Sequence, residues 1–371
     1  MAGVINVSQF PILRTFSRRS SVPAGIRTSI PATRASSSEI PPSSGATTAA
    51  TRGEEQEAAP SFAAPAGFKT PEPKRFAIRP DKGLDVAGAA LALFFRLGTG
   101  VFLNGYSVSF VSKDEIPADQ YALELAGYKV KETSKLGPRP EQPIMIYEFE
   151  RNRDTECLYF FYPCSNGGNQ PANLQLSFLS KGIVVLNTVR EIVAVLDLDV
   201  LFYPCPRNGP NFRPKAVELG GKQQFPYMVD PNTGVSMYES DAIIKYLVDK
   251  YGDGRVPLML SLGLLTTLTA GFAMIGRMGR GQSYIPSKLP PKPLELWAYE
   301  GSPFCKLVRE VLVELELPHI YRSCARGSPK RQILYAKTGH FQAPYLEDPN
   351  TGVQMFESAE IIEYLTATYA A

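Results

Sequence analysis

The sequence predicts an α/β fold in which one βαβαββα unit is used twice in tandem. The string DPNTGV occurs at residues 230–235 and again at residues 348–353. The likeness extends around both strings, and the matching stretches are 145–150 with 296–300, 188–207 with 307–326, and 225–247 with 343–365. Such self-similarity indicates one structural unit that the chain uses twice.

The second copy shows the elements of this unit clearly. Residues 294–299 form an apolar run that predicts a strand, and residues 302–316 place apolar side chains at helical spacing on one face. The pattern then predicts a strand at 320–324, a short helix at 330–337, strands at 345–347 and 354–356, and a final helix at 358–368. The Asp-Pro-Asn-Thr-Gly stretch between the last two strands predicts a hairpin turn, because proline presets φ and glycine supplies a positive φ.

Three short motifs mark this order of elements. A Ser-Pro-Phe-Cys stretch, followed by Val-Arg, opens the first helix of the second copy within residues 302–309. The other two motifs occur in both copies: Phe225-Pro226 and Ala343-Pro344 before the third strand, and Glu239-Ser240 and Glu357-Ser358 at the start of the last helix. In this combination the chain resembles the thioredoxin-like fold and, more narrowly, the N-terminal domain of glutathione transferases and the related glutaredoxins. The resemblance covers residues 142–251 and 293–369 and implies two tandem thioredoxin-like domains.

Ser302 is the first candidate catalytic residue. In the family it resembles, this position bears the Ser, Tyr or Cys that contacts the glutathione sulfur. A serine hydroxyl at a helix N-terminus would donate a hydrogen bond to the thiolate and lower the pKa of the thiol. A structural role explains the same residues, since serine is a favoured N-cap and proline a favoured first helical residue. The other motifs favour the catalytic interpretation.

Cys305 is the second candidate catalytic residue. It lies in the first helical turn, where the helix dipole favours a thiolate. Dithiol glutaredoxins carry Cys-x-x-Cys, and the first cysteine attacks. Here Ser302 occupies the first place and Cys305 matches the second, which weakens a dithiol mechanism. A buried and unreactive cysteine is the alternative.

The resemblance also implies glutathione-binding positions in both copies. In the family, the residue before a cis-proline offers its backbone to the cysteinyl part of glutathione. The Glu-Ser pair holds the γ-glutamyl end, with the serine and helix N-terminus on the α-carboxylate and the glutamate on the α-amino group. The positions implied here are Phe225, Pro226, Glu239 and Ser240 in the first copy, and Ala343, Pro344, Glu357 and Ser358 in the second. The alternatives are a trans-proline at a strand start and a serine that only caps its helix.

The first copy lacks the Ser-Pro-Phe-Cys motif. In its place residues 151–187, which include Cys157 and Cys164, have no counterpart in the second copy. A loop of this length is unusual and needs a reason. This segment is either a functional insertion with two new thiols or intron sequence retained in a gene model. Because it stands at the site of the missing motif, we favour the gene-model interpretation.

The N-terminal region predicts targeting and linker segments. Residues 1–38 contain five arginines and many Ser and Thr but no Asp or Glu, which is typical of a transit peptide, here of the chloroplast type. Residues 39–82 are rich in Pro, Ser, Ala and Glu and predict a disordered linker. We therefore expect a chloroplast protein, in the stroma or at the surface of the thylakoid or envelope.

Two further segments are apolar. Within the linker of residues 252–292, residues 256–276 carry no charge and are long enough to cross a bilayer. We favour a helix packed on the two copies or on a membrane surface over a membrane span. Residues 83–141 form an apolar segment and linker in which Arg96 would cost about 2.5–3.5 kcal/mol at a bilayer centre, so we expect an amphipathic or buried segment.

Composition and domain order limit the classes of function that the chain can have. The net charge of +3 gives no argument for nucleic acid, and the five cysteines and two histidines show no metal-ligand spacing. The second copy, residues 293–371, is not followed by the all-helical domain that supplies the electrophile pocket of glutathione transferases. We expect glutathione as cofactor and an unknown small electrophile or disulfide as partner, in transferase or thiol–disulfide chemistry. The alternative is a non-catalytic interaction module with peripheral association at a plastid membrane surface.

Overall fold

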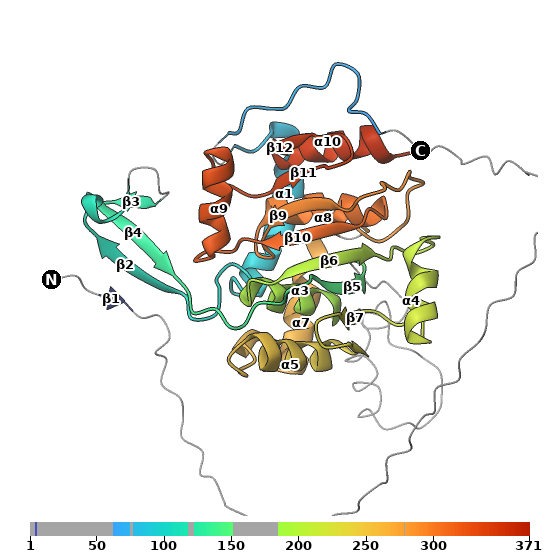
Figure 1. The fold of residues 1–371 in the computed structure, drawn as a ribbon, viewed down its shortest axis with the longest axis horizontal. Helices are drawn as coiled ribbons and strands as arrows, with labels where there is room; N and C mark the ends of the chain where they lie inside the picture. The colour runs from blue at the N-terminus through green and yellow to red at the C-terminus, as the bar shows by residue number, and fades with distance from the viewer. Residues whose placement is uncertain (1–3, 6–61, 75–76, 118–121, 151–184, 278) are drawn as a thin grey trace, which may run out of the picture. The chain divides into compact units, whose positions relative to one another are not determined.

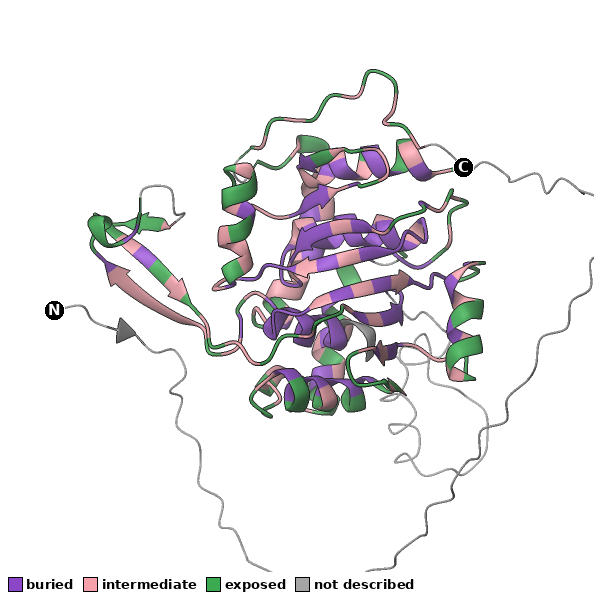
Figure 2. Cartoon of the chain, in the orientation of Figure 1, coloured by how far each residue is buried: buried purple, intermediate pink, exposed green. Residues whose placement is uncertain are grey.

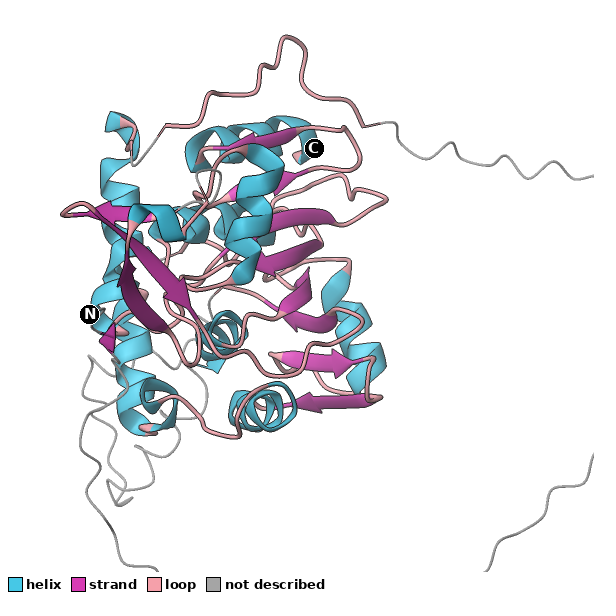
Figure 3. Ribbon diagram, turned by 60° about the vertical axis from the view of Figure 1, so that its left-hand side comes forward, coloured by secondary structure: helices cyan, strands magenta, loops and turns pink. Residues whose placement is uncertain are grey.

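The strands of the two copies join in one mixed sheet. The computed structural model describes residues 4–5, 62–74, 77–117, 122–150, 185–277 and 279–371. Its larger sheet has eight strands in the order β12-β11-β9-β10-β6-β5-β7-β8, which lie side by side in Figures 1 and 3. These strands are β5 (Ile144–Glu148), β6 (Asp199–Pro204), β7 (Tyr227–Asp230), β8 (Val235–Tyr238), β9 (Leu294–Ala298), β10 (His319–Ser323), β11 (Tyr345–Glu347) and β12 (Gln354–Phe356).

Each half of the sheet has the same order of elements. The helices of the first half are α3 (Val185–Val195), α4 (Phe212–Gly220) and α5 (Ser240–Tyr251), and those of the second are α8 (Pro303–Glu314), α9 (Pro329–Thr338) and α10 (Ser358–Tyr369). In each half the first two strands pair in parallel and the others antiparallel. Every element expected in the second copy is present, with ends within two residues of the predicted ones.

The two halves meet along β6 and β10. These strands pair antiparallel, with His319 opposite Phe202 and Arg322 opposite Asp199. Each would be an exposed edge strand if its copy stood alone, with unpaired backbone groups. The pairing satisfies both edges and makes one continuous sheet.

The main hydrophobic core lies on one face of this sheet. It is formed by the central strands and by α3, α5, α8 and α10, and includes Ile192, Leu247, Leu312 and Leu365, all fully buried. Figure 2 shows that the central strands are largely buried. Two smaller clusters, around Tyr147 below α4 and around Leu334 of α9, form elsewhere on the sheet.

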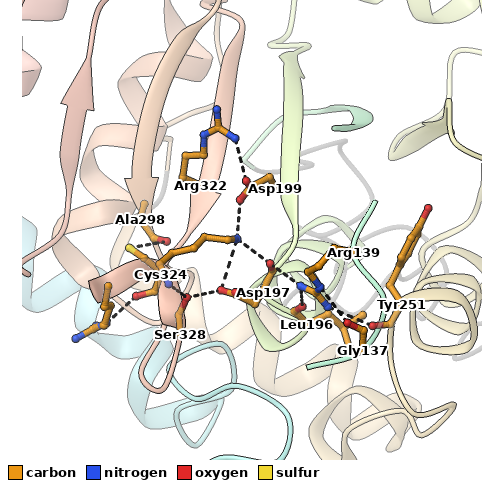
Figure 4. A network of polar contacts seen from close by, with 12 residues as sticks. Gly137, Arg139, Leu196, Asp197, Asp199, Tyr251, Ala298, Arg322, Cys324 and Ser328 are labelled. Carbon is orange, nitrogen blue, oxygen red and sulfur yellow. Dashed lines mark hydrogen bonds and ion pairs between the residues drawn. The ribbon is translucent and has the colours of Figure 1, made fainter. Parts of the chain in front are cut away.

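Two acidic residues tie the copies together through helix starts. Asp197 Oδ1 accepts a hydrogen bond from Ser328 Oγ (2.7 Å), and Ser328 is the N-cap of α9 (Figure 4). At the equivalent place in the second copy, Glu316 accepts from the backbone N–H groups of Asn211 (3.1 Å) and Phe212 (2.9 Å) at the start of α4. Glu316 therefore satisfies N–H groups that the start of α4 leaves unpaired, whereas Asp197 holds Ser328, whose own hydroxyl oxygen caps α9 by accepting from the Lys330 N–H (3.1 Å).

Residues 83–102 and 256–277 pack on the outside of this assembly. They form α1 (Gly83–Phe95), α6 (Leu258–Ser261), α7 (Leu264–Ala273) and a 3-10 turn, η4 (Ile275–Arg277). A Cβ at Gly88 would lie 2.4 Å from the Gly276 carbonyl oxygen, so the approach of α1 to η4 requires glycine. Arg96 is buried and pairs with Glu191 (2.7 Å). In the part of the chain that the structure describes, no helix has the length and apolar character needed to cross a membrane.

A small sheet occupies residues expected to be linker. Its strands are β1 (Val4–Ile5), β2 (Ser107–Val111), β3 (Leu123–Leu125) and β4 (Tyr128–Thr133), in the order β1-β2-β4-β3. Short 3-10 turns, η1 (Pro80–Lys82) and η2 (Lys113–Glu115), precede α1 and follow β2. Strands β2, β3 and β4 therefore lie within the predicted apolar segment and linker of residues 83–141, whereas β1 lies within the predicted transit peptide of residues 1–38.

Residues 62–74 pack along α10, although the sequence predicts a disordered linker over 39–82. The Phe62 ring lies 5.1 Å from the ring of Tyr369, and the Phe68 ring lies 5.1 Å from that of Tyr364. These two aromatic side chains explain the difference, because burying them offsets the entropy of ordering a Pro- and Ala-rich stretch. The linker therefore ends earlier than the sequence predicts.

The boundary of the predicted insertion also shifts. Helix α3 begins at Val185, so residues 185–187 belong to the helix and not to the insertion of residues 151–187. The remainder of that insertion, with Cys157 and Cys164, lies outside the described residues, as does nearly all of the predicted transit peptide.

Candidate functional site

A cavity in the second copy gathers most of its predicted site residues. Its volume is about 150 Å³, and its wall includes Ser302, Ala343, Pro344, Glu357 and Ser358. These residues come from the start of α8, the loop before β11 and the start of α10. Residues far apart in the sequence thus face one space, as the resemblance implies.

Ser302 caps the first helix of the second copy. Its Oγ accepts a hydrogen bond from the Cys305 N–H (3.2 Å), and Pro303 follows as the first helical residue. The side chain is only 2% exposed but reaches the cavity wall. Because the oxygen accepts this bond, the hydroxyl hydrogen can still donate to an anion at the helix N-terminus.

Cys305 is fully buried and is not part of the cavity wall. Burial raises the pKa of its thiol, and the opposing hydrogen bond with Ser302 does not compensate. The expected effect of the helix dipole is therefore outweighed by desolvation. This environment keeps Cys305 protonated at neutral pH and favours the unreactive alternative.

Both predicted prolines follow cis peptide bonds. Phe225-Pro226 and Ala343-Pro344 are cis. In the second copy, Ala343 and Pro344 face the same cavity as Ser302. The Ala343-Pro344 peptide of the second copy therefore lies in the same cavity wall as Ser302.

Glu357 is held by two donors at the other end of the cavity. Its Oε1 accepts from Gln342 Nε2 (3.0 Å) and from the backbone N–H of Lys74 (2.6 Å). The residue has a positive φ of 74° and precedes Ser358, the first residue of α10. Donors from two other segments therefore fix the Glu357 carboxylate at the cavity wall.

The cavity also contains residues that the sequence analysis did not assign to a site. Tyr299, Arg326 and Arg331 all line it. Arg331 lies over the Tyr299 ring, 5.3 Å from the centroid. Tyr299 lies three residues before Ser302, so the sequence could have indicated it as a site residue. Arg331 belongs to α9, and no sequence spacing connects that helix with Ser302.

The first copy differs at the equivalent place. Phe225 stands where the second copy has Ala343, and its ring packs edge-on against Phe149 at 5.7 Å. The Arg213 guanidinium lies 5.0 Å from the centroids of both rings. Glu239 keeps a positive φ and accepts from Gln224 Nε2 (2.6 Å), and Ser240 begins α5. The first copy thus keeps the backbone of the site but places a phenyl ring where the second has a methyl group.

A buried ionic cluster connects the two equivalent helices, α3 and α8, with the ends of the strands that precede them. Arg309 is fully buried and pairs with Glu300 (2.7 Å) and with Glu150 of the first copy (3.2 Å). Arg190 pairs with Glu150 at 2.5 Å and also with Glu148. Burial raises the pKa of Glu148 to about 8, whereas for Glu150 the two arginines overcome burial and lower the pKa to about 2. The cluster fixes Glu300, two residues before Ser302, against the first copy.

Comparison with known families agrees with this geometry. Residues 185–255 and 296–371 match the family model described as glutathione S-transferase, N-terminal domain. No curated protein and no solved structure matched the chain. The matched segments run from α3 past α5 and from β9 through α10, so each carries a cis-proline and a Glu-Ser pair. These segments are therefore similar to the thioredoxin-like N-terminal domain of glutathione transferases, which supports a glutathione-related function.

Proposed function

We propose that the second copy binds glutathione and activates its thiol at Ser302 for a transferase reaction. The observation that carries this proposal is the cavity that brings Ser302, Ala343-Pro344 and Glu357-Ser358 together. In this proposal the residues offer one partner to each part of the tripeptide. The sulfur has a hydrogen-bond donor, the cysteinyl group has backbone partners, and the γ-glutamyl group has the N-terminus of α10. The family match at residues 296–371 supports the same ligand.

Each part of the ligand has a chemical partner in this proposal. The Ser302 hydroxyl donates to the sulfur, which favours the thiolate and hence the nucleophile. The Glu357 carboxylate accepts hydrogen bonds from the α-amino group, while the Ser358 hydroxyl and the N-terminus of α10 bind the α-carboxylate. The burial of Cys305 makes thiol–disulfide exchange at this residue the weaker of the two reactions considered.

We further propose that the chain contains two tandem thioredoxin-like domains and that it acts in the chloroplast. The repeated element order and the transit-like composition of residues 1–38 support these statements. In this arrangement the first copy supports the second, since Phe225 occupies the place of Ala343. Import of the full chain into isolated chloroplasts, with shortening of the N-terminus, would test the location.

Calorimetric titration of the full chain with glutathione tests the binding proposal. Glu357→Gln should weaken binding about tenfold or more, which corresponds to ~1.4 kcal/mol. Glu239→Gln, the matched change in the first copy, should leave the affinity unchanged. An absence of binding, or equal effects of the two substitutions, would refute the proposed site.

A rate measurement tests the role of Ser302. With a halide electrophile such as chlorodinitrobenzene, Ser302→Ala should lower the conjugation rate about tenfold or more and raise the pKa of the bound thiol, with a smaller effect on glutathione affinity. If the wild-type chain binds glutathione but shows no conjugation above background, the non-catalytic interaction module becomes the better interpretation.

A second candidate function, peripheral membrane association, rests on an exposed apolar surface. Large apolar side chains project from α1, α6 and α7 and the residues next to them: Leu84 (91% exposed), Phe94 (74%), Leu97 (76%), Leu258 (71%), Leu265 (51%) and Phe272 (45%). Exposed apolar residues on packed helices are typical of interaction or membrane surfaces. In a flotation assay with anionic vesicles, the wild-type chain should rise with the vesicles. The double variant Leu265→Lys, Phe272→Lys should stay in the unbound fraction. Equal flotation of both, or no flotation of either, would reject this function.

A further inference from the structure

A second cavity lies beside the proposed glutathione site, between the small sheet and α9. Its volume is about 320 Å³. The apolar side of its wall includes Val130 of β4, Ile116 and Leu136. The polar side includes Ser134, Ser328 and Arg331. This combination suits a ligand with one apolar part and one polar group.

Arg331 lines both cavities and therefore lies between them. Its Nε donates to the Cys324 carbonyl oxygen (2.8 Å), and its guanidinium is stacked over the Tyr299 ring. No described residue accepts a hydrogen bond from its two terminal nitrogens. Arg331 is thus a positioned cation whose terminal N–H groups donate to no described residue, and a guanidinium in this state can bind a carboxylate through two parallel hydrogen bonds.

The segment that carries Arg331 is fixed by the first copy. Cys324 N–H donates to the Ala298 carbonyl (2.9 Å), and Ser328 is held by Asp197 (Figure 4). Lys330 adds bonds from Nζ to Asp199 Oδ1 (2.6 Å) and to the Asp197 carbonyl (2.7 Å). A cation that is held in place before binding loses little conformational entropy when its ligand arrives.

Ser134 supplies a second unused polar group. Its Oγ is buried and has no hydrogen-bond partner among the described residues, although it belongs to the cavity wall. A buried hydroxyl without a partner is costly, and a ligand oxygen would satisfy it. The cavity thus offers apolar walls together with the Ser134 hydroxyl and the Arg331 guanidinium. Lys131 and Glu132 also line it, and the Glu132 carboxylate is paired with Arg326.

We propose that this cavity is the site of the second substrate, an apolar molecule that carries a carboxylate. The carboxylate binds Arg331, and the apolar part packs against Val130, Ile116 and Leu136. The role as second substrate rests on the proposed glutathione function, but binding of the carboxylate does not. The small sheet thereby supplies one wall of the pocket for the second substrate.

Titration of the full chain with octanoate, and separately with 1-octanol, tests the proposal. Octanoate should bind at least tenfold more tightly than the neutral alcohol. Arg331→Met should remove this preference, while Arg213→Met, the matched change in the first copy, should retain it. Val130→Trp should fill the cavity and weaken octanoate binding tenfold, with an unchanged glutathione affinity that shows the variant is folded.

The outcomes separate this inference from the proposed function. Octanoate binding without glutathione binding would support the carboxylate site in this cavity and refute the proposed glutathione function. Glutathione binding with no preference for octanoate over octanol in the wild-type chain would overturn the inference even if Val130→Trp fails to fold. A loss of glutathione affinity in Arg331→Met with unchanged octanoate affinity would assign Arg331 to the tripeptide and also overturn it.

Discussion

The carboxylate of Glu316 should be a main support of the contact between the two copies, and Glu316→Ala tests this directly. The side chain is fully buried and accepts from the backbone N–H groups of Asn211 and Phe212 and from Asn211 Nδ2 (2.6 Å). Its loss leaves the start of α4 without a cap. Loss of an N-cap costs ~1–2 kcal/mol, and hydrogen bonds to charged groups contribute ~1.5–3 kcal/mol each.

The net cost is smaller than the sum of these bonds. Burial raises the pKa of Glu316, so part of the hydrogen-bond energy offsets the desolvation of the carboxylate. We expect Glu316→Ala to lower the free energy of unfolding by about 2–3 kcal/mol, roughly 4–10 °C in Tm for a domain of this size. Glu316→Gln keeps an acceptor oxygen and should cost about half as much.

Urea denaturation followed by circular dichroism and by the fluorescence of Trp297 measures both effects. Trp297 lies in the second copy, whereas the uncapped helix lies in the first. Both signals should shift together, because the cap joins the copies into one cooperative unit. A loss below about 0.5 kcal/mol, or a shift in only one signal, would refute the reasoning.

Three further predictions concern the site and its surroundings. Ala343→Phe, which gives the second copy the aromatic residue of the first, should lower glutathione affinity at least tenfold, whereas a fully retained affinity in calorimetry would show that the cavity is not the site. Folded protein exposed to oxidised glutathione should gain no adduct at Cys305, and an adduct lost in Cys305→Ser by intact mass spectrometry would contradict its burial. Burial raises the pKa of Glu148 in the folded state to about 8. Between the unfolded pKa of about 4.5 and pH 8, the folded state therefore binds a proton that the unfolded state has lost, and the free energy of unfolding falls as the pH rises through this range. Glu148→Gln should reduce this fall, as judged by urea midpoints at pH 5 and pH 8, and an identical pH dependence in both proteins would count against it.

The internal repeat made most of the second copy predictable. Apolar spacing located its helices, the Asp-Pro-Asn-Thr-Gly turn located its hairpin, and the motifs located Ser302, Pro344 and Glu357 in what proved to be one cavity. These signals are local, because each depends on side chains a few residues apart. Hence their positions could be read from the chain without knowledge of its tertiary structure.

Other features depend on contacts that leave no local pattern. The pairing of β6 with β10 joins strands more than a hundred residues apart. The sequence of either strand would show the same pattern if that strand stood at the edge of a sheet. The packing of residues 62–74 depends on two phenylalanines in a stretch whose composition is that of a linker. Arg331 became a site residue only because α9 and the small sheet meet around it.

The two copies serve as an internal comparison of scaffold and site. Asp230 and Asp348 are both buried, and each accepts hydrogen bonds from two tyrosine hydroxyls at 2.5–2.6 Å, so the hairpin turn is supported identically in both copies. The cis-prolines and the positive φ of Glu239 and Glu357 are likewise shared.

The copies diverge where a ligand would enter. Phe225 and Phe149 both pack against Arg213 in the first copy, whereas in the second copy Ala343 and Arg331 line a cavity together with Ser302. Since the scaffold is held by the same contacts, stability does not require this difference. The simplest physical account is a division of labour. The first copy completes the sheet, holds the α9 N-cap Ser328 through Asp197 and fixes Glu300 through the ionic cluster, so the cavity of the second copy is surrounded by fixed elements.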